Sequence, residues 1–169
     1  MPTETLISVE EYLATSYRPD CDYVDGRIEE RNLGEWDHAD LQTAVATYFR
    51  TRAKKWGIRA VVEQRVQVSP TRFRIPDVTV ILGDPDGKIL RKPPFICIEI
   101  LSPEDRMSRV RTRVQDFLAM GVAYVWILDP EARCAYVATQ SEALREVQEP
   151  VLRTENPALE VSLSELFES

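Results

Sequence analysis

One run of the chain, residues 95–101, is apolar on both of its faces apart from a single acid, Glu99. A strand that faces water on one side alternates polar and apolar residues, whereas a strand covered on both sides stays apolar throughout. The run therefore predicts a central strand of a sheet with a packed layer on each side. This requirement favours an α/β or α+β fold in which helices flank a mixed sheet.

Two helical patterns in the sequence can supply those layers. Between residues 37 and 56 apolar residues recur at spacings of three to four, which predicts an amphipathic helix that ends at Gly57. After the central run, Ser102 as a cap and Pro103 at the first helical position predict a second helix, which runs to Met120. The sequence thus predicts one long helix before the central strand and one directly after it.

Strand signals account for much of the remaining chain. Residues 21–30 predict a hairpin, because Asp-Gly between alternating residues suits a tight type I′ turn. Further strands are predicted at 58–68, 75–82, 122–128 and 134–138, and short helices after the Ser8 cap and at 164–167. No linker or repeat is visible, so residues 1–169 are expected to form a single domain with an N-terminal helix and hairpin.

The composition argues against several classes of protein. No stretch approaches the roughly 18 uninterrupted apolar residues of a membrane span, and no basic segment followed by an apolar one opens the chain. A cytoplasmic protein with no membrane partner is therefore expected. Cys21, Cys97 and Cys134 are far apart and odd in number, and there is one histidine, so neither a disulfide framework nor a zinc site is predicted.

Charge is distributed unevenly along the chain. The formal net charge is -7, yet residues 50–113 hold fifteen Lys and Arg against seven Asp and Glu, while the remainder holds six against twenty-one. A basic segment favours a polyanion such as nucleic acid. Ordinary solvated helix and loop surface explains the same segment equally well.

Two acids, Asp77 and Glu99, lie 22 positions apart in predicted strands that are otherwise apolar. Burying a carboxylate is unfavourable unless a partner or a cation offsets it. Side by side on one face, the two would have to share a proton or a cation, and oxygen ligands select Mg²⁺ or Mn²⁺. Such a cation can activate water against a phosphodiester. Alternatively, Asp77 marks a turn or a strand edge, and a buried Arg74 or Arg113 neutralises Glu99.

Three arginines follow the central run. Arg106, Arg109 and Arg113 are spaced by three and four, which places them on one face of the predicted helix. We expect this face to hold phosphates at the mouth of a metal site, and Arg74 of the same basic segment joins the predicted nucleic-acid contacts. The other interpretation is a solvated face with pairs to Glu104 and Asp105.

Longer motifs add a resemblance to a known family. The segments Ile75-Pro76-Asp77-Val78, Ile98-Glu99-Ile100-Leu101-Ser102-Pro103, FLAMGVAYVWILD, DYVDGRIEERN and WDHADLQ resemble the Uma-two family of bacterial restriction endonucleases, in the PD-(D/E)XK nuclease superfamily. The resemblance covers nearly the whole chain. It implies a restriction-endonuclease-like core that cleaves phosphodiester bonds of DNA with Mg²⁺, where Asp77 is the motif aspartate and Glu99 the second metal ligand.

The resemblance also implies roles for three further residues and shows one departure. Asp22 would complete or support the acidic site as a metal ligand. His38 matches a family histidine and is a candidate catalytic acid or base, although a capping or packing role suits it too. The superfamily lysine would fall at Leu101, and the lysine that relatives carry in the next helix falls at Arg113. Arginine stays protonated, so Arg113 can stabilise phosphate charge but cannot be a general base.

Three expectations remain. Gln64, polar within a strand, is a weaker candidate for orienting water or a ligand. Because the expected lysine is absent, a nuclease-fold protein that binds nucleic acid or a protein without cutting stands as the alternative to an endonuclease. Nucleases that cut both strands often pair as symmetric dimers, and the apolar C-terminal strands could supply a homodimer interface.

Overall fold

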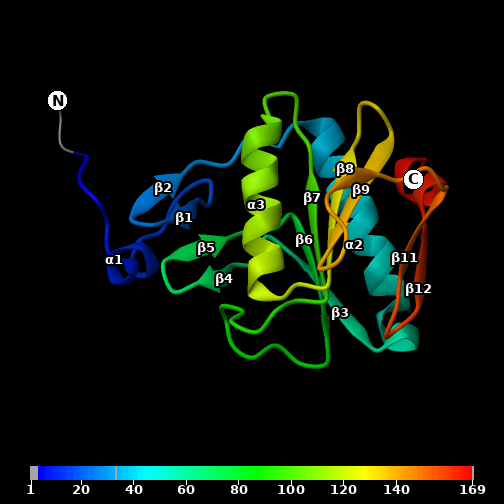
Figure 1. Cartoon of the computed structure of the whole chain (residues 1–169), viewed down its shortest axis with the longest axis horizontal. Coiled ribbons are helices and arrows are strands. Elements are labelled where there is room, and N and C mark those ends of the chain that lie inside the picture. Colours follow the sequence, from blue (N-terminus) through cyan, green and yellow to red (C-terminus); the bar gives the residue numbers. More distant parts are fainter. Residues whose placement is uncertain (1–3, 33, 169) are drawn as a thin grey trace.

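A mixed sheet lies at the centre of the molecule, with one long helix on each face (Figure 1). The computed structural model describes residues 4–32 and 34–168. Within these residues the sheet has the strand order β10-β9-β8-β7-β6-β3. Its strands are β3 (Ile58–Val62), β6 (Val78–Leu82), β7 (Ile96–Ile100), β8 (Tyr124–Asp129), β9 (Cys134–Thr139) and β10 (Arg145–Glu146).

Strands β7 and β8 run parallel, and the other neighbouring strands of this sheet that the structure describes are antiparallel. A parallel pair needs a long crossover connection, and helix α3 (Met107–Met120) supplies it. The expected mixed sheet flanked by helices is confirmed.

The central strand β7 is buried on both faces, as the apolar run predicted. Ile96, Ile98 and Ile100 pack in the core that helix α2 (Trp36–Trp56) covers. The intervening Cys97 belongs to the second core, which is built with α3. Because side chains alternate along a strand, Glu99 also faces the α3 side.

A smaller sheet and one helix form the N-terminal part. The sheet has the order β2-β1-β5-β4 and consists of β1 (Asp22–Val24), β2 (Arg27–Glu29), β4 (Val66–Ser69) and β5 (Arg72–Arg74). Helix α1 (Val9–Ala14) begins after the Ser8 cap and buries Tyr12 against Tyr23 and Phe73. The N-terminal helix and hairpin are thus confirmed.

The C-terminal residues pack back onto α2. Hairpin β11 (Val151–Thr154) and β12 (Leu159–Ser162) is followed by α4 (Leu163–Phe167), close to the predicted short helix. Leu152, Leu159 and Val161 are buried in the core of their own chain. These strands therefore do not expose the apolar surface that the suggested dimer interface would need.

Two predicted strands have different bounds in the structure. The strand predicted at 58–68 is two strands in different sheets, because the chain turns at Glu63, whose φ is 55°. The strand predicted at 75–82 begins only at Val78, so Asp77 precedes β6 rather than lying within it.

The predicted helix start at Ser102 is wrong. Helix α3 begins at Met107, with Arg106 as its N-cap residue. The side chain of Asp105 accepts a hydrogen bond from the backbone N–H of Ser102 at 2.7 Å, which closes a local turn. Side chains of this kind compete with helical hydrogen bonding, and here the turn prevails. Among the described helices, none is long and apolar enough to span a membrane.

Candidate functional site

Asp77 and Glu99 face each other at the ends of β6 and β7. In this antiparallel pair Val78 lies opposite Ile98, and the two acids are the next residues beyond that pair. Asp77 is 3% exposed and Glu99 is 7% exposed. The structure therefore brings the two predicted acids together at one end of the central sheet.

Asp77 is surrounded by donors. Its Oδ2 accepts a hydrogen bond from the backbone N–H of Ile100 at 2.7 Å, and its Oδ1 accepts one from Nη2 of Arg31 at 2.9 Å. Nε2 of His38 lies 3.3 Å from Oδ2. Burial alone would raise the pKa of Asp77, but His38, Arg31 and the Ile100 N–H together lower it. The hydrogen bond between His38 and Asp77 raises the pKa of His38. Asp77 is therefore held as a carboxylate.

Glu99 has one cationic partner. Its Oε1 accepts a hydrogen bond from Nη2 of Arg113 at 2.6 Å, and the described residues leave Oε2 without a hydrogen-bond partner. Burial raises the pKa of Glu99 to about 8, even though Arg113 opposes the shift, and the nearby charge of Asp77 adds to it. The surroundings thus shift the two pKa values in opposite directions, that of Asp77 down and that of Glu99 up.

Arg113 connects Glu99 with the third predicted acid. Its Nη2 lies 3.3 Å from the carbonyl oxygen of Ile75 and 3.7 Å from Oδ2 of Asp22. Asp22 is 1% exposed, and its oxygens already accept from the backbone N–H of Ile75 and from Arg74. It does not line the cavity described below. In the structure Asp22 is a partner of the two arginines, which is the supporting alternative of the prediction.

Arg74 is a buried structural cation and not a phosphate contact. Its side chain is 1% exposed and forms ion pairs with Asp22, Glu29 and Asp116. Three carboxylates leave no face of the guanidinium for a nucleic acid. Arg74 also does not touch Glu99, so of the two arginines considered as neutralising partners, Arg113 has that role.

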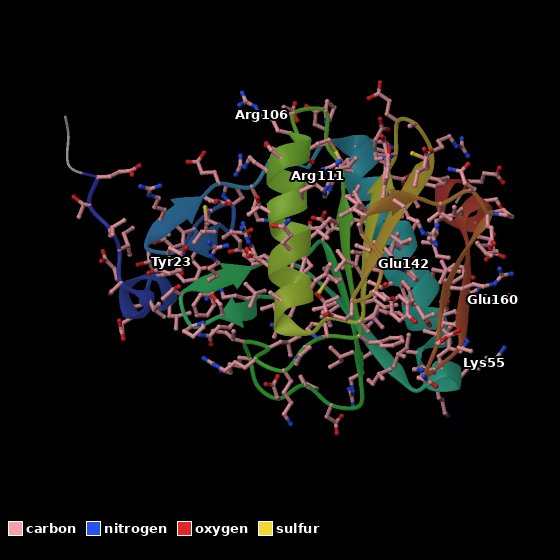
Figure 2. The ribbon with its side chains drawn as sticks, viewed as in Figure 1. Tyr23, Lys55, Arg106, Arg111, Glu142 and Glu160 are labelled. Atoms are coloured by element: carbon pink, nitrogen blue, oxygen red, sulfur yellow. The ribbon has the colours of Figure 1, made fainter. Side chains whose placement is uncertain are left out.

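The predicted arginine face is only partly at the site. Arg109 lines the cavity with a side chain that is 55% exposed and donates to the backbone oxygen of Glu30 at 3.4 Å. Figure 2 shows Arg106 at the amino end of α3, and this residue does not line the cavity. The described residues also show no ion pair between these arginines and Glu104 or Asp105. Arg109 and Arg113 are the two members of the face that line the cavity, and of these Arg113 contacts Glu99.

Sequence reasoning missed Arg31, Gln42 and Glu63. Arg31 bridges Asp77 and Glu63, and Gln42 donates to Oε1 of Glu63 and to the backbone oxygen of Asp77, both at 2.9 Å. Gln42 lies four positions after His38, so helical spacing could have revealed it. Arg31 lies between β2 and α2, where no periodic pattern exists.

Gln64 has a structural role. Its side-chain amide donates to the backbone oxygens of Arg65 and Lys88, at 2.9 and 2.8 Å. These bonds tie the start of β4 to the loop before β7. Gln64 does not line the acidic cavity, so its prediction as a ligand-orienting residue is not supported.

A small cavity of about 50 Å³ opens beside the acidic pair. Such a volume holds a cation with a few waters, since one water needs roughly 10–15 Å³ of this kind of space. The cavity is lined by Glu30, Arg31, Asn32, His38, Asp77, Glu99, Ile100, Leu101, Ser102, Asp105, Arg109, Val110 and Arg113. Basic and acidic side chains thus meet in one confined space.

The donor set around this cavity suits a hard divalent cation. Within the described residues, no group of three or more His, Cys, Asp or Glu side chains is arranged to hold a metal ion. Mg²⁺ is usually bound through one or two carboxylates and keeps several waters. Two carboxyl groups that line this cavity are those of Asp77 and Glu99. Of the two, Glu99 keeps one oxygen, Oε2, without a hydrogen-bond partner among the described residues.

The fold defines the class of protein. The structure superposes with a TM-score of 0.82 on the crystal structure of a "putative nuclease belonging to DUF820" from Anabaena variabilis, at 23% sequence identity, covering 96% of this chain and 98% of that chain. The protein therefore has a nuclease-like fold of mixed α/β class. A structure of a DrdV–DNA complex aligns with a TM-score of 0.42 and 18% identity over 74% of this chain and 10% of that chain.

The family follows from the sequence itself. The model of the Uma2 family, described as "Putative restriction endonuclease", matches residues 9–168. The chain belongs to the Uma2 family, and the resemblance noted from its motifs is confirmed. A search among curated proteins finds no match.

Proposed function

We propose that this protein is a Mg²⁺-dependent endonuclease that hydrolyses phosphodiester bonds in DNA, with Mn²⁺ as a substitute. The observation that carries the proposal is the pair Asp77 and Glu99, which face each other across β6 and β7 beside a small cavity with arginines on its walls. Membership of a restriction endonuclease family supports nuclease activity. The basic residues at the cavity favour a polyanionic substrate.

Asp77 and Glu99 would hold the cation, which, when bound, polarises a phosphate oxygen and acidifies a water. The other residues have distinct tasks. His38 and the N–H of Ile100 fix the orientation of Asp77. Since the pKa of His38 is raised by Asp77, its imidazole is a hydrogen-bond donor there rather than a free base. Arg113, always protonated, stabilises negative charge that develops on the phosphate.

Calorimetric titration with Mn²⁺ tests the proposal. Asp77→Asn and Glu99→Gln keep the shape of each side chain and remove its charge, so each is expected to weaken Mn²⁺ binding at least tenfold. Asp84→Asn is the matched control, because Asp84 is an exposed acid that pairs with Arg59. Equal Mn²⁺ affinities for wild type and both site variants would overturn the metal site.

A second candidate function has its own support. Both acids already have cationic partners, Arg31 and His38 for Asp77 and Arg113 for Glu99, and no lysine lines the described part of the cavity. These features favour a nuclease-fold protein that binds nucleic acid without cutting it. Supercoiled plasmid incubated with Mg²⁺ or Mn²⁺ between pH 6 and 9 separates the two. Nicking that Glu99→Gln abolishes supports the endonuclease, and Mn²⁺ binding without nicking supports the second candidate.

A further inference from the structure

Arg31 enters the acidic cavity from outside the central sheet. It lies in the connection between β2 and α2, and its guanidinium pairs with Oδ1 of Asp77 at 2.9 Å and with Glu63. Only 11% of its side chain is exposed. The arginine therefore lies on one of the two carboxylates proposed to bind a cation.

We propose that Arg31 is a phosphate-contacting residue that pairs with Asp77 in the ligand-free protein and turns to a phosphate of the nucleic acid once a divalent cation binds. The inference rests on the proposed function, because it takes Asp77 and Glu99 as the cation ligands. A dication held by Asp77 would compete with the guanidinium for the carboxylate and would repel it. A phosphate then becomes the better partner, since its geometry matches the planar fork of arginine as a carboxylate does.

The local structure allows this exchange. Residues 30–35 belong to neither a helix nor a strand in their described part, so Arg31 lies in an irregular segment of the chain. The next residue anchors the backbone: Nδ2 of Asn32 donates to Oγ of Ser102 at 3.0 Å and to Oδ1 of Asp105 at 2.8 Å. The connection thus crosses from β2 to the turn after β7. Arg31 can exchange partners while its backbone stays beside the cavity.

The proposal predicts effects of opposite sign on two ligands. Removing Arg31 removes a competitor for Asp77, so the affinity for a divalent cation without nucleic acid should rise. It also removes a phosphate contact, so nucleic acid should bind more weakly and the slope of log affinity against log salt should fall by about 1. Removing a merely structural residue would lower both affinities. Removing a residue that only blocks the cavity would raise both.

The experiment compares wild type, Arg31→Gln and the control Arg27→Gln. Arg27 lies on β2, shortly before the connection that carries Arg31, and its side chain is 66% exposed in a pair with Glu4. Mn²⁺ binding is measured from the electron paramagnetic resonance of free Mn²⁺. Binding of a fluorescein-labelled 20-base-pair duplex is measured by anisotropy in Ca²⁺ at several KCl concentrations. Arg31→Gln should bind Mn²⁺ about threefold to tenfold more tightly and the duplex about tenfold more weakly. Arg27→Gln should match wild type.

Several outcomes would overturn the inference. Unchanged Mn²⁺ affinity, unchanged duplex affinity, or a shift of both in the same direction in Arg31→Gln each excludes it. If Arg31→Gln does not fold, judged by thermal unfolding, Arg31→Lys replaces it. This variant keeps the positive charge and loses the planar guanidinium. It should bind Mn²⁺ more tightly than wild type, while the salt dependence of its duplex binding stays that of wild type. An unchanged Mn²⁺ affinity would exclude the inference. If the wild-type protein does not bind Mn²⁺ through Asp77 and Glu99, that result contradicts the proposed function instead.

Discussion

Asp77 and Glu99 share one cavity, yet the protein neutralises them in different ways. Asp77 has three donors, from His38, Arg31 and the backbone of Ile100, and they lower its pKa despite burial. Glu99 has Arg113 alone and burial dominates, so its pKa rises to about 8. A pair of acids whose environments separate their pKa values is typical of sites that handle protons or cations.

The raised pKa of Glu99 predicts how stability depends on pH. Its folded pKa of about 8 exceeds its ordinary value of 4.5, so between these values the native state binds more protons than the unfolded state. The free energy of unfolding of the metal-free protein should therefore fall as pH rises from about 4.5 to 8. Glu99→Gln should flatten this decline, measured by urea unfolding at pH 5, 6.5 and 8. The raised pKa of His38 contributes a separate decline of the free energy of unfolding above the ordinary pKa of histidine.

Glu160→Gln is the matched control for that experiment. Glu160 has a side chain that is 69% exposed and pairs with Arg153 at the surface. Its removal should leave the pH profile of the wild type intact. A Glu99→Gln profile that keeps the full wild-type slope would show that Glu99 ionises normally.

Single residues also show how far sequence reasoning reaches. An acid in an apolar strand is visible in the sequence, so Asp77 and Glu99 could be predicted as a pair. Their partners were harder to find, because Arg31 lies 46 positions before Asp77 in an irregular connection. Arg113 was visible through helical spacing, but its direct bond to Glu99 depends on how α3 packs over β7. Charge partners from different elements require the tertiary structure.

At the scale of elements, strong hydrophobic patterns predicted whether a segment is a helix or a strand well, and where it begins and ends less well. The central strand and both long helices are present, since burial on one or two faces leaves a clear period. The start of α3 was misplaced, because Asp105 closes a turn that the sequence pattern of Ser102 and Pro103 did not reveal. The turn matters for the site, since Ser102 and Asp105 line the cavity.

The end of α2 allows a clean prediction about one glycine. Gly57 has a φ of 65°, and an added Cβ would meet no atom within 4 Å. Gly57→Ala should therefore destabilise the protein by about 1 kcal/mol through backbone conformation alone. Gly87→Ala is the control, because Gly87 has no positive φ, and it should change the free energy of unfolding by less than about 0.5 kcal/mol. Equal effects in chemical denaturation would refute the backbone explanation.

A second element-scale prediction concerns the joint between the small sheet and α3. Arg74 on β5 pairs with Glu29 on β2 and with Asp116 on α3, and it is almost fully buried. Arg74→Met removes the buried cation that pairs with Asp22 and Asp116 and should cost about 3–5 kcal/mol in urea unfolding. Arg153→Met removes an arginine with a side chain 57% exposed and should cost less than about 0.5 kcal/mol. A loss below about 1 kcal/mol for Arg74→Met would mean that the joint is not held by this arginine.

At the scale of the whole molecule, the site exists only when distant parts of the chain are assembled. The acids come from the central sheet, His38 from α2, Arg113 from α3, and Arg31 from the N-terminal connection. Each of these elements packs into a different layer (Figure 1). A ligand that binds the acidic pair should therefore stabilise the complete fold, because the unfolded chain cannot bring these residues together.

Stabilisation by a bound cation should increase as pH rises, whereas the free energy of unfolding of the metal-free protein should decrease. Cation binding requires the Glu99 carboxylate, so apparent Mn²⁺ affinity should fall about tenfold for each pH unit below the pKa of about 8. At about 100 times its Kd, Mn²⁺ should add about 2.7 kcal/mol, a rise in melting temperature of about 5–10 °C. If the Mn²⁺ concentration is fixed at about 100 times the Kd measured at pH 8.5, calorimetric scans at pH 6 should show little of this rise in melting temperature. Glu99→Gln should show none at either pH, and a rise that is equal at pH 6 and 8.5 in the wild type would mean that Mn²⁺ binds elsewhere.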